Sequence, residues 1–382
     1  MIPSPGIFIL GVAIFLIVAW DAFESIILPR RVTRKFRLTR FYYLFTWQSW
    51  KFYALLIRSK KPKEAFLGFF GPISLIFLIA VWAVGLVLSF GMMQYGAGSA
   101  VNISGMNPSF FTDLYLSGTT FFTLGLGDVV PRSGLARFLV VAEAGFGFGF
   151  LAAVIGYLPF IYGAFGRRET NIALLDARAG TPPTAGEMLR RHSYPTGNEA
   201  LGELLKEWER WCAELLESHL SYPVLAYFRS QHDNESWIAA LTAILDVCSL
   251  TIAGIEDACA KQAELTFAIA RHAVVDLCQV FGAPPRSPEP ARLTPEMLLR
   301  LRTKLAQHGT TLSSTPEADA KLLELRQMYE PYVYALADHL KQKLPPWIPD
   351  HKGKDNWQTT AWARASAQTG EEAISLAHDD HF

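Results

Sequence analysis

The chain has 382 residues, 51% of them hydrophobic and 18% charged, and its formal net charge at pH 7 is zero. The charges balance overall, and no nucleic-acid partner is expected. They are unevenly placed, because residues 65–112 and 144–165 contain none, residues 30–63 hold eleven Lys and Arg, and acidic residues outnumber basic ones 29 to 20 from residue 169 onward. This profile predicts a membrane protein with a soluble part.

No nucleophile–base pair, metal-ligand spacing or phosphate-binding loop stands out, so we predict neither an enzymatic activity nor an organic cofactor. The N-terminus lacks a basic n-region and a small-residue cleavage site, and no signal peptide is expected. The four cysteines form no CxxC pair and all follow the last apolar stretch. They are expected to be reduced and buried in a cytosolic domain. These residues are Cys212, Cys248, Cys259 and Cys278.

Three apolar stretches, residues 6–28, 68–94 and 135–165, are long enough to cross a bilayer as helices. Basic residues are concentrated between the first and second stretches and directly after the third. Since cytoplasmic loops are rich in Lys and Arg, the N-terminus and residues 95–134 are expected outside. Everything after residue 166 is expected in the cytoplasm.

Two features near the first stretch allow more than one interpretation. Residues 41–57 are apolar and aromatic, and we interpret them as an interfacial helix on the inner membrane surface rather than a fourth span. Asp21 and Glu24 lie near the inner end of the first stretch. Pairing with the basic cluster or contact with water would satisfy them, and a coupling or sensing role is the alternative.

Residues 107–131 predict a re-entrant hairpin between the second and third stretches. Asn107 is suited to cap a short helix over 109–121, and Pro108 suits its first position. The chain then returns outward as TLGLGD, residues 123–128. Gly125 and Gly127 allow successive carbonyl oxygens to point toward one axis, where rings of carbonyls replace the hydration shell of a cation. One hairpin supplies one quarter of such a ring, which implies a homotetramer.

The pattern T-L-G-L-G-D-x-x-P between two spans resembles the T-V-G-Y-G-D signature of potassium channels. The resemblance covers roughly residues 68–166. It implies that K⁺ is the permeant ion and that it binds along the filter. The implied filter residues are Thr123, Leu124, Gly125, Leu126 and Gly127, with K⁺ at the first four.

The filter also departs from the family pattern. Leu124 and Leu126 stand where the family has Val and Tyr, and Phe122 stands where many members have a second Thr. The sequence T-I-G-L-G-D, similar to this one, occurs in the second pore loop of some two-pore-domain potassium channels. A nonselective monovalent cation pore is therefore the nearest alternative. Without the family's Tyr, an apolar cuff that includes Tyr115 and Leu116 is expected to surround the filter.

The resemblance also implies residues that support the filter and gate the pore. Asp128 would anchor the filter from behind, and its alternative role is to form a turn. Glu143 is expected to face the pore helix and to bond Thr119 or Thr120, with direct attraction of ions as the alternative. Gly147 falls at the family's hinge glycine, with close helix packing as the alternative, and Pro159 is expected to kink the inner helix. A constriction is expected at the inner end, around Tyr157, Leu158 and Phe160.

After Arg168 the pattern predicts helices over 201–220, 236–281, 294–307 and 316–343, with a proline-rich linker over 282–295. Residues 236–255 are apolar enough for a span, but Asp246 would cost about 3 kcal/mol at its centre, so we predict a buried core helix. The segments RRHSYP (190–195) and SHLSYP (218–223) are interpreted as turns and helix caps, and a metal or pH-sensing site is the alternative.

The sequence thus predicts an all-α membrane protein that forms a homotetrameric potassium channel. Expected segments are an N-terminal transmembrane helix (1–30), a basic cytoplasmic loop with an interfacial helix (31–65), a pore domain (66–166), a helical cytoplasmic domain (167–345) and a polar tail (346–382). The expected partners are the lipid bilayer, other copies of the chain and an unspecified cytoplasmic regulator. A non-conducting receptor or scaffold with a relic pore loop is the alternative from a different class.

Overall fold

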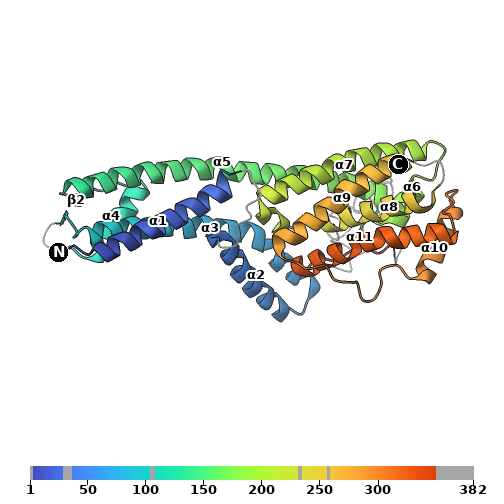
Figure 1. The fold of residues 1–382 in the computed structure, drawn as a ribbon, viewed down its shortest axis with the longest axis horizontal. Coiled ribbons are helices and arrows are strands. Elements are labelled where there is room, and N and C mark those ends of the chain that lie inside the picture. Colours follow the sequence, from blue (N-terminus) through green and yellow to red (C-terminus); the bar gives the residue numbers. More distant parts are fainter. Residues whose placement is uncertain (1–2, 29–36, 104–107, 231–234, 256–258, 350–382) are drawn as a thin grey trace, which may run out of the picture. The chain divides into compact units, whose positions relative to one another are not determined.

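The computed structural model describes residues 3–28, 37–103, 108–230, 235–255 and 259–349 (Figure 1). The chain divides into two compact units, residues 1–163 and 164–382. Both units are mainly helical, as the sequence predicts. In the described residues, four helices are long and apolar enough to cross a membrane. They are α1 (Pro5–Ile26), α3 (Lys60–Gly96), α5 (Gly134–Ala179) and α8 (Trp237–Gly254).

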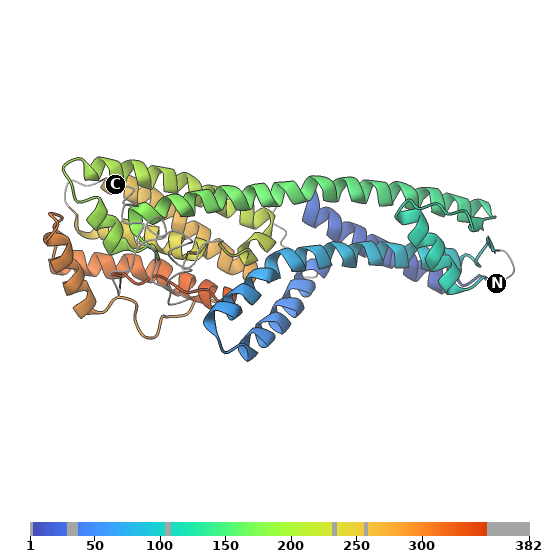
Figure 2. The ribbon, with the colours of Figure 1, turned by 180° about the vertical axis from the view of Figure 1, so that it is seen from behind.

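In the first unit, α1 and α3 lie side by side and run in opposite directions (Figures 1 and 2). The backbone N–H of Ser4 donates to the carbonyl of Gly96 at 2.8 Å, which joins the start of α1 to the end of α3. Glycine makes the close approach possible, because a Cβ on Gly11 would lie 2.8 Å from the carbonyl oxygen of Ser89. Close backbone approach at small residues is typical of helices packed in membranes.

Helix α2 (Leu38–Leu56) pairs with the first half of α3 and leaves the α1–α3 pair at an angle (Figure 2). The rings of Trp50 and Phe66 stack with centroids 4.5 Å apart, and the Tyr42 hydroxyl donates to the Ser74 carbonyl at 2.8 Å. The opposite face of α2 exposes large apolar side chains, which are Phe41, Leu44, Phe45, Phe52, Leu55 and Leu56. This amphipathic pattern is the one expected of an interfacial helix, and its place in the membrane stays a prediction.

The acidic residues of α1 have different partners. Asp21 is buried and accepts hydrogen bonds from the Trp82 indole at 2.9 Å and from the backbone N–H of Thr39 at 3.2 Å. Glu24 forms an ion pair with Arg37 at 3.4 Å. The expected pairing with basic residues therefore holds for Glu24, whereas Asp21 joins α1, α2 and α3 through neutral donors. The other basic residues of this cluster that precede Arg37 lie outside the described residues.

The predicted hairpin contains helix α4 (Phe110–Phe121), and two short strands flank it. Strand β1 (Val101–Ile103) pairs antiparallel with β2 (Val129–Pro131). The expected cap at Asn107 is wrong, because the N-cap is Ser109, and Asn107 itself lies outside the described residues. The side chain of Ser109 bonds the backbone N–H of Thr112, and the side chain of Thr112 bonds that of Ser109. This reciprocal capping box satisfies two amides that would otherwise lack partners. Pro108 therefore precedes the helix and does not open it.

Helix α5 is continuous for 46 residues, and the boundary between the two units falls inside it. At 1.5 Å per residue it is about 69 Å long, roughly twice the hydrocarbon thickness of a bilayer. Only part of it can therefore lie in the membrane. The helix runs unbroken through Gly147 and Pro159, the two positions where a hinge and a kink are expected.

The second unit is a helical bundle built around α8. Every residue of α8 from Trp237 to Thr251 is buried, which amounts to 83% of the helix. The prediction of a buried core helix agrees with this burial. The expected continuous helix over 236–281 is wrong at its centre, because α8 ends at Gly254 and Ile255 adopts an extended conformation. The surrounding elements are α6 (Ala185–Arg191), α7 (Gly197–Ser221), η1 (Pro223–Tyr227), α9 (Ala260–Phe281), α10 (Pro295–Ala306) and α11 (Pro316–Leu340).

A buried ionic network surrounds Asp246 at the centre of α8. Arg292, from the proline-rich linker, donates to both carboxylate oxygens of Asp246 at 3.1 and 2.7 Å. The same guanidinium donates to Glu330 at 3.3 Å, and the Tyr329 hydroxyl also donates to Asp246. Burial lowers the pKa of Arg292, but its interactions with Asp246, Tyr329 and Glu330 together outweigh that effect and raise the pKa overall. The network ties the linker and α11 to the core helix.

Candidate functional site: the loop after helix α4

The loop that follows α4 has an unusual backbone. Thr123, Gly125 and Gly127 have positive φ angles of 58°, 56° and 79°, while Leu124 and Leu126 between them do not. The left-handed region is accessible to glycine, but it is a strained outlier for a β-branched residue such as Thr123. Strain of this kind persists where the surrounding structure imposes it, and it is concentrated at functional sites.

The end of α4 holds this loop through backbone carbonyl groups. The carbonyl of Thr119 accepts hydrogen bonds from the N–H groups of Leu124 at 2.8 Å and Gly125 at 3.3 Å. The carbonyl of Thr120 accepts one from Thr123 at 3.0 Å. The hydroxyl of Thr119 bonds within its own helix, to Leu116. The two threonines predicted to support the filter therefore contact it through main-chain atoms.

A polar contact joins α4 to the far end of the loop. The Tyr115 hydroxyl donates to the carboxylate of Asp128 at 2.9 Å. The other carboxylate oxygen of Asp128 accepts from the N–H of Val129 at 3.1 Å. The expectation of a purely apolar cuff is thus wrong at Tyr115, because its ring carries a hydroxyl that reaches Asp128. The Tyr115–Asp128 hydrogen bond therefore connects the helix before the loop to the end of the loop. The role of Asp128 as a filter anchor stays a prediction.

Glu143 of α5 faces α4, as expected, but its partner differs from the predicted ones. Its carboxyl group is wholly buried and contacts the Ser117 hydroxyl, not Thr119 or Thr120. Ser117 lies one helical turn before Phe121, on the face of α4 that meets α5. Ser117 is three residues before Thr120 and so lies on the same side of α4 as that predicted partner, but the sequence does not show which face of α4 points toward α5.

Gly147 lies one turn after Glu143 and is the point where α5 approaches the end of α4. A Cβ on Gly147 would lie 2.3 Å from the carbonyl oxygen of Phe121, a distance that real Cβ atoms do not reach. Close packing therefore accounts for a glycine here without a hinge. Pro159, the other predicted gating position, is exposed within the continuous helix. Gating at either residue stays a prediction.

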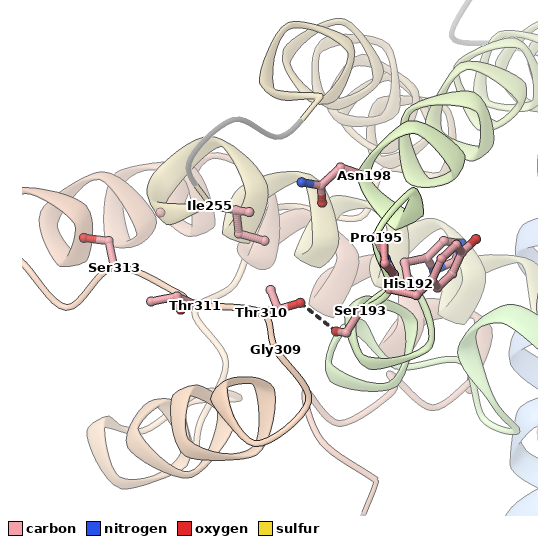
Figure 3. A pocket seen from close by; sticks show the side chains of 11 residues that line it. His192, Ser193, Pro195, Asn198, Ile255, Gly309, Thr310, Thr311 and Ser313 are labelled. Atoms are coloured by element: carbon pink, nitrogen blue, oxygen red, sulfur yellow. Dashed lines mark hydrogen bonds between the residues drawn. The ribbon is translucent and has the colours of Figure 1, made fainter.

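Residues 192–195 of the RRHSYP segment line part of a polar cavity in the second unit (Figure 3). The cavity has a volume of 510 Å³, and its wall includes the turn after α6 and the segment between α10 and α11. Ser193 and Thr310 are hydrogen-bonded across it at 2.6 Å. Burial lowers the pKa of His192, one of its lining residues. In the part of the chain that the structure describes, no group of three or more His, Cys, Asp or Glu is placed to hold a metal. Residues 192–195 follow the end of α6, which agrees with the turn predicted for the RRHSYP segment.

The long apolar helices of the described residues are the features of a helical membrane protein, and a strained loop follows its short capped helix α4. A family model described as "Ion channel" matches residues 75–159, which run from within α3 through α4 and the loop into α5. The match agrees with the sequence resemblance, and residues 75–159 are similar to this ion-channel family.

A similar curated protein is the "Uncharacterized membrane protein YdjJ" of Bacillus subtilis (strain 168). It is 25% identical over 181 residues, which cover 46% of this chain and 51% of the relative. The match thus spans about half the length of that relative. No solved structure matches the chain.

Proposed function

We propose that the chain is a potassium-selective or potassium-preferring channel, in which four copies surround one axial pore. The observation that carries this proposal is the alternation of positive and negative φ over residues 123–127. An alternating backbone can turn successive carbonyl oxygens toward one side, where they replace the water around a dehydrated cation. Thr123, Leu124, Gly125 and Leu126 would supply those oxygens, and Thr123 would add its hydroxyl at the inner end.

The exposure of this loop supports an assembly around it. Residues 122–128 are all exposed in the single chain, and the side chains of Leu124 and Leu126 are 61% and 63% exposed. Lipid can cover apolar side chains, but it cannot satisfy the peptide groups of an irregular loop at membrane depth. Neighbouring protein and a water-filled path can do so. A closed ring of four copies provides both.

The orientation in the membrane follows from the charges. Basic residues on either side of α2 would keep that segment at the inner surface, with the N-terminus outside and the helical second unit in the cytoplasm. The second unit would then assemble the tetramer or respond to a cytoplasmic regulator. We favour a cell-membrane location.

Ion flux through liposomes that contain the purified protein tests conduction, and reversal potentials in mixed K⁺ and Na⁺ test selectivity. Gly125→Ala is expected to abolish K⁺ flux, because alanine at φ 56° costs about 1 kcal/mol in each subunit and displaces the carbonyls. Gly166→Ala is the matched control, since a Cβ there meets no atom within 4 Å. It is expected to conduct normally.

Two other outcomes would change the assignment. Equal permeability to K⁺ and Na⁺ would establish the nonselective cation channel, which the leucines at 124 and 126 and Phe122 favour. A folded tetramer without flux under any condition would contradict the channel and support a receptor or scaffold that keeps a relic pore loop.

A further inference from the structure

The Ser117 hydroxyl of α4 contacts two oxygen atoms, one from α3 and one from α5, but it carries a single hydrogen. The Ser117 hydroxyl oxygen lies 2.7 Å from the Val87 carbonyl oxygen of α3, and it also contacts Oε1 of Glu143. A serine hydroxyl has one hydrogen, and a backbone carbonyl can only accept. Ser117 therefore cannot donate to both neighbours. One of the two short oxygen–oxygen contacts needs a second hydrogen.

The carboxyl group of Glu143 is the one place that can supply this hydrogen. If Glu143 is protonated, it donates to Ser117, and Ser117 donates to Val87. If Glu143 is ionised, one pair of oxygens faces each other with no hydrogen between them. Its second oxygen, Oε2, is also buried and has no partner among the described residues. Burying this unpaired oxygen costs less free energy if the carboxyl group is neutral than if it is charged.

The surrounding charges do not compensate an ionised Glu143. Residues 65–112, which include most of α3, carry no charge. On α4 the acidic residue is Asp113, whose carboxyl group bonds Ser99. On α1 the ionisable side chains are both acidic. The nearest basic residue along α5, Arg137, is nearly two turns away and donates to the Pro131 carbonyl at 3.4 Å. A buried carboxylate without a cation costs several kcal/mol.

We propose that the carboxyl group of Glu143 is protonated and donates a hydrogen bond to Ser117. Ser117 in turn donates to Val87, so a hydrogen-bonded chain runs from α5 through α4 to α3. Glu143 and Gly147 are one turn apart on α5, and they meet Ser117 and Phe121, which are one turn apart on α4. The chain therefore fixes the helix whose last carbonyls hold the loop over 123–125. Glu143 is a positioning residue for the filter. This role rests on the proposed channel function, whereas its protonation does not.

Infrared difference spectroscopy of the full chain in liposomes tests the protonation. At neutral pH, Glu143→Gln is expected to remove a carbonyl stretching band of a protonated carboxyl group. Glu199→Gln is the matched control, because Glu199 is exposed on α7, and it is expected to remove carboxylate bands only. Loss of carboxylate bands in Glu143→Gln would overturn the proposal. The readout needs no ion flux, so it is independent of whether the protein conducts.

Reversal potentials in mixed K⁺ and Na⁺ test the positioning role. Glu143→Gln is expected to keep the wild-type preference for K⁺, because its amide N–H can donate to Ser117 as the acid does. Glu143→Leu and Ser117→Ala break the chain and are expected to lose most of that preference while they remain tetramers by size-exclusion chromatography. Wild-type selectivity in both broken variants would overturn the positioning role. A wild-type protein that does not conduct would instead contradict the proposed function.

Discussion

The two units bury acidic side chains in different ways. In the first unit, Asp21 is bonded by an indole and by Thr39, and Glu143 is bonded by a serine hydroxyl. In the second unit, Asp246 and Glu330 are bonded by arginine side chains. The apolar helices of the first unit hold few cations, so neutral groups bond Asp21 and Glu143, whereas Glu24, at the end of α1, pairs with Arg37. The helices and linker of the second unit contain arginines, and the side chains of Arg292 and Arg326 point inward to these acids.

This difference predicts which substitutions destabilise each unit most. A carboxylate–arginine network gains from Coulomb attraction but leaves a buried charge if one partner is removed. A chain of neutral hydrogen bonds contributes less stabilisation than a charged network, and its strength depends closely on distances and angles. We therefore expect charge removal to damage the second unit most, and small steric changes to damage the first.

The largest expected effect is from Arg292→Met in the second unit. This change leaves Asp246 and Glu330 buried without the guanidinium they share, and it is expected to lower the free energy of unfolding by about 3–5 kcal/mol. Chemical denaturation in detergent micelles, followed by tryptophan fluorescence, measures the change. Arg210→Met is the control, since the Arg210 side chain is 84% exposed in its pair with Glu214. It should cost less than about 0.5 kcal/mol. Similar losses in both variants would contradict the comparison.

The next effect is a pH dependence from Glu187 in the second unit. Burial alone would raise the pKa of Glu187, but hydrogen bonds and charges from Arg190 and Arg191 lower it from 4.5 to about 2. The unfolded state therefore binds more protons between these two pH values. The stabilisation, at most about 3 kcal/mol, is complete above pH 4.5 and is lost as the pH falls toward about 2.

Thermal unfolding of the wild type and Glu187→Gln as a function of pH measures this contribution. The wild type should be the more stable at neutral pH, and the difference should shrink in acid. A difference that does not change with pH would show that the Glu187 carboxylate does not provide the stabilisation.

In the first unit, Gly147→Ala is expected to cost about 1–3 kcal/mol, because the new Cβ collides with the Phe121 carbonyl and displaces the end of α4. K⁺ flux in liposomes should fall with it. Gly149→Ala is a matched control on the same helix, where a Cβ meets no atom within 4 Å. That change should be neutral or stabilise α5 by up to about 1 kcal/mol. Equal tolerance of both alanines would show that α4 and α5 are not in close contact.

The smallest effect is expected from Ser109→Ala, which removes the side-chain cap of α4 and costs about 1 kcal/mol. Hydrogen exchange of the peptide over residues 108–121, followed by mass spectrometry, should show faster exchange at the start of the helix. Ser109→Asn should restore protection, because asparagine also caps helices well. Unchanged exchange in the alanine variant would mean that neighbouring contacts, not the cap, hold the start of α4.

Local patterns in the sequence were enough to predict most of the helices, but not the short α6 or the end of α8 at Gly254. The apolar runs predicted α1, α3 and the outer part of α5, and the helical spacing after residue 200 predicted α7 and α11. The presence of Asp246 in an apolar stretch distinguished a core helix from a span. The glycines at 125 and 127 located the loop, because few other residues accept its backbone angles. Each of these inferences depends on residues that are neighbours along the chain.

The tertiary structure decided which residues meet across the chain. It selected Ser117 as the partner of Glu143, placed Arg292 on Asp246, joined Tyr115 to Asp128, and brought Gly147 against Phe121. A periodic pattern shows that a helix has a buried face, but it does not specify the rotation and the height at which that face meets another helix. Those two quantities are set by how all the side chains at the interface pack together.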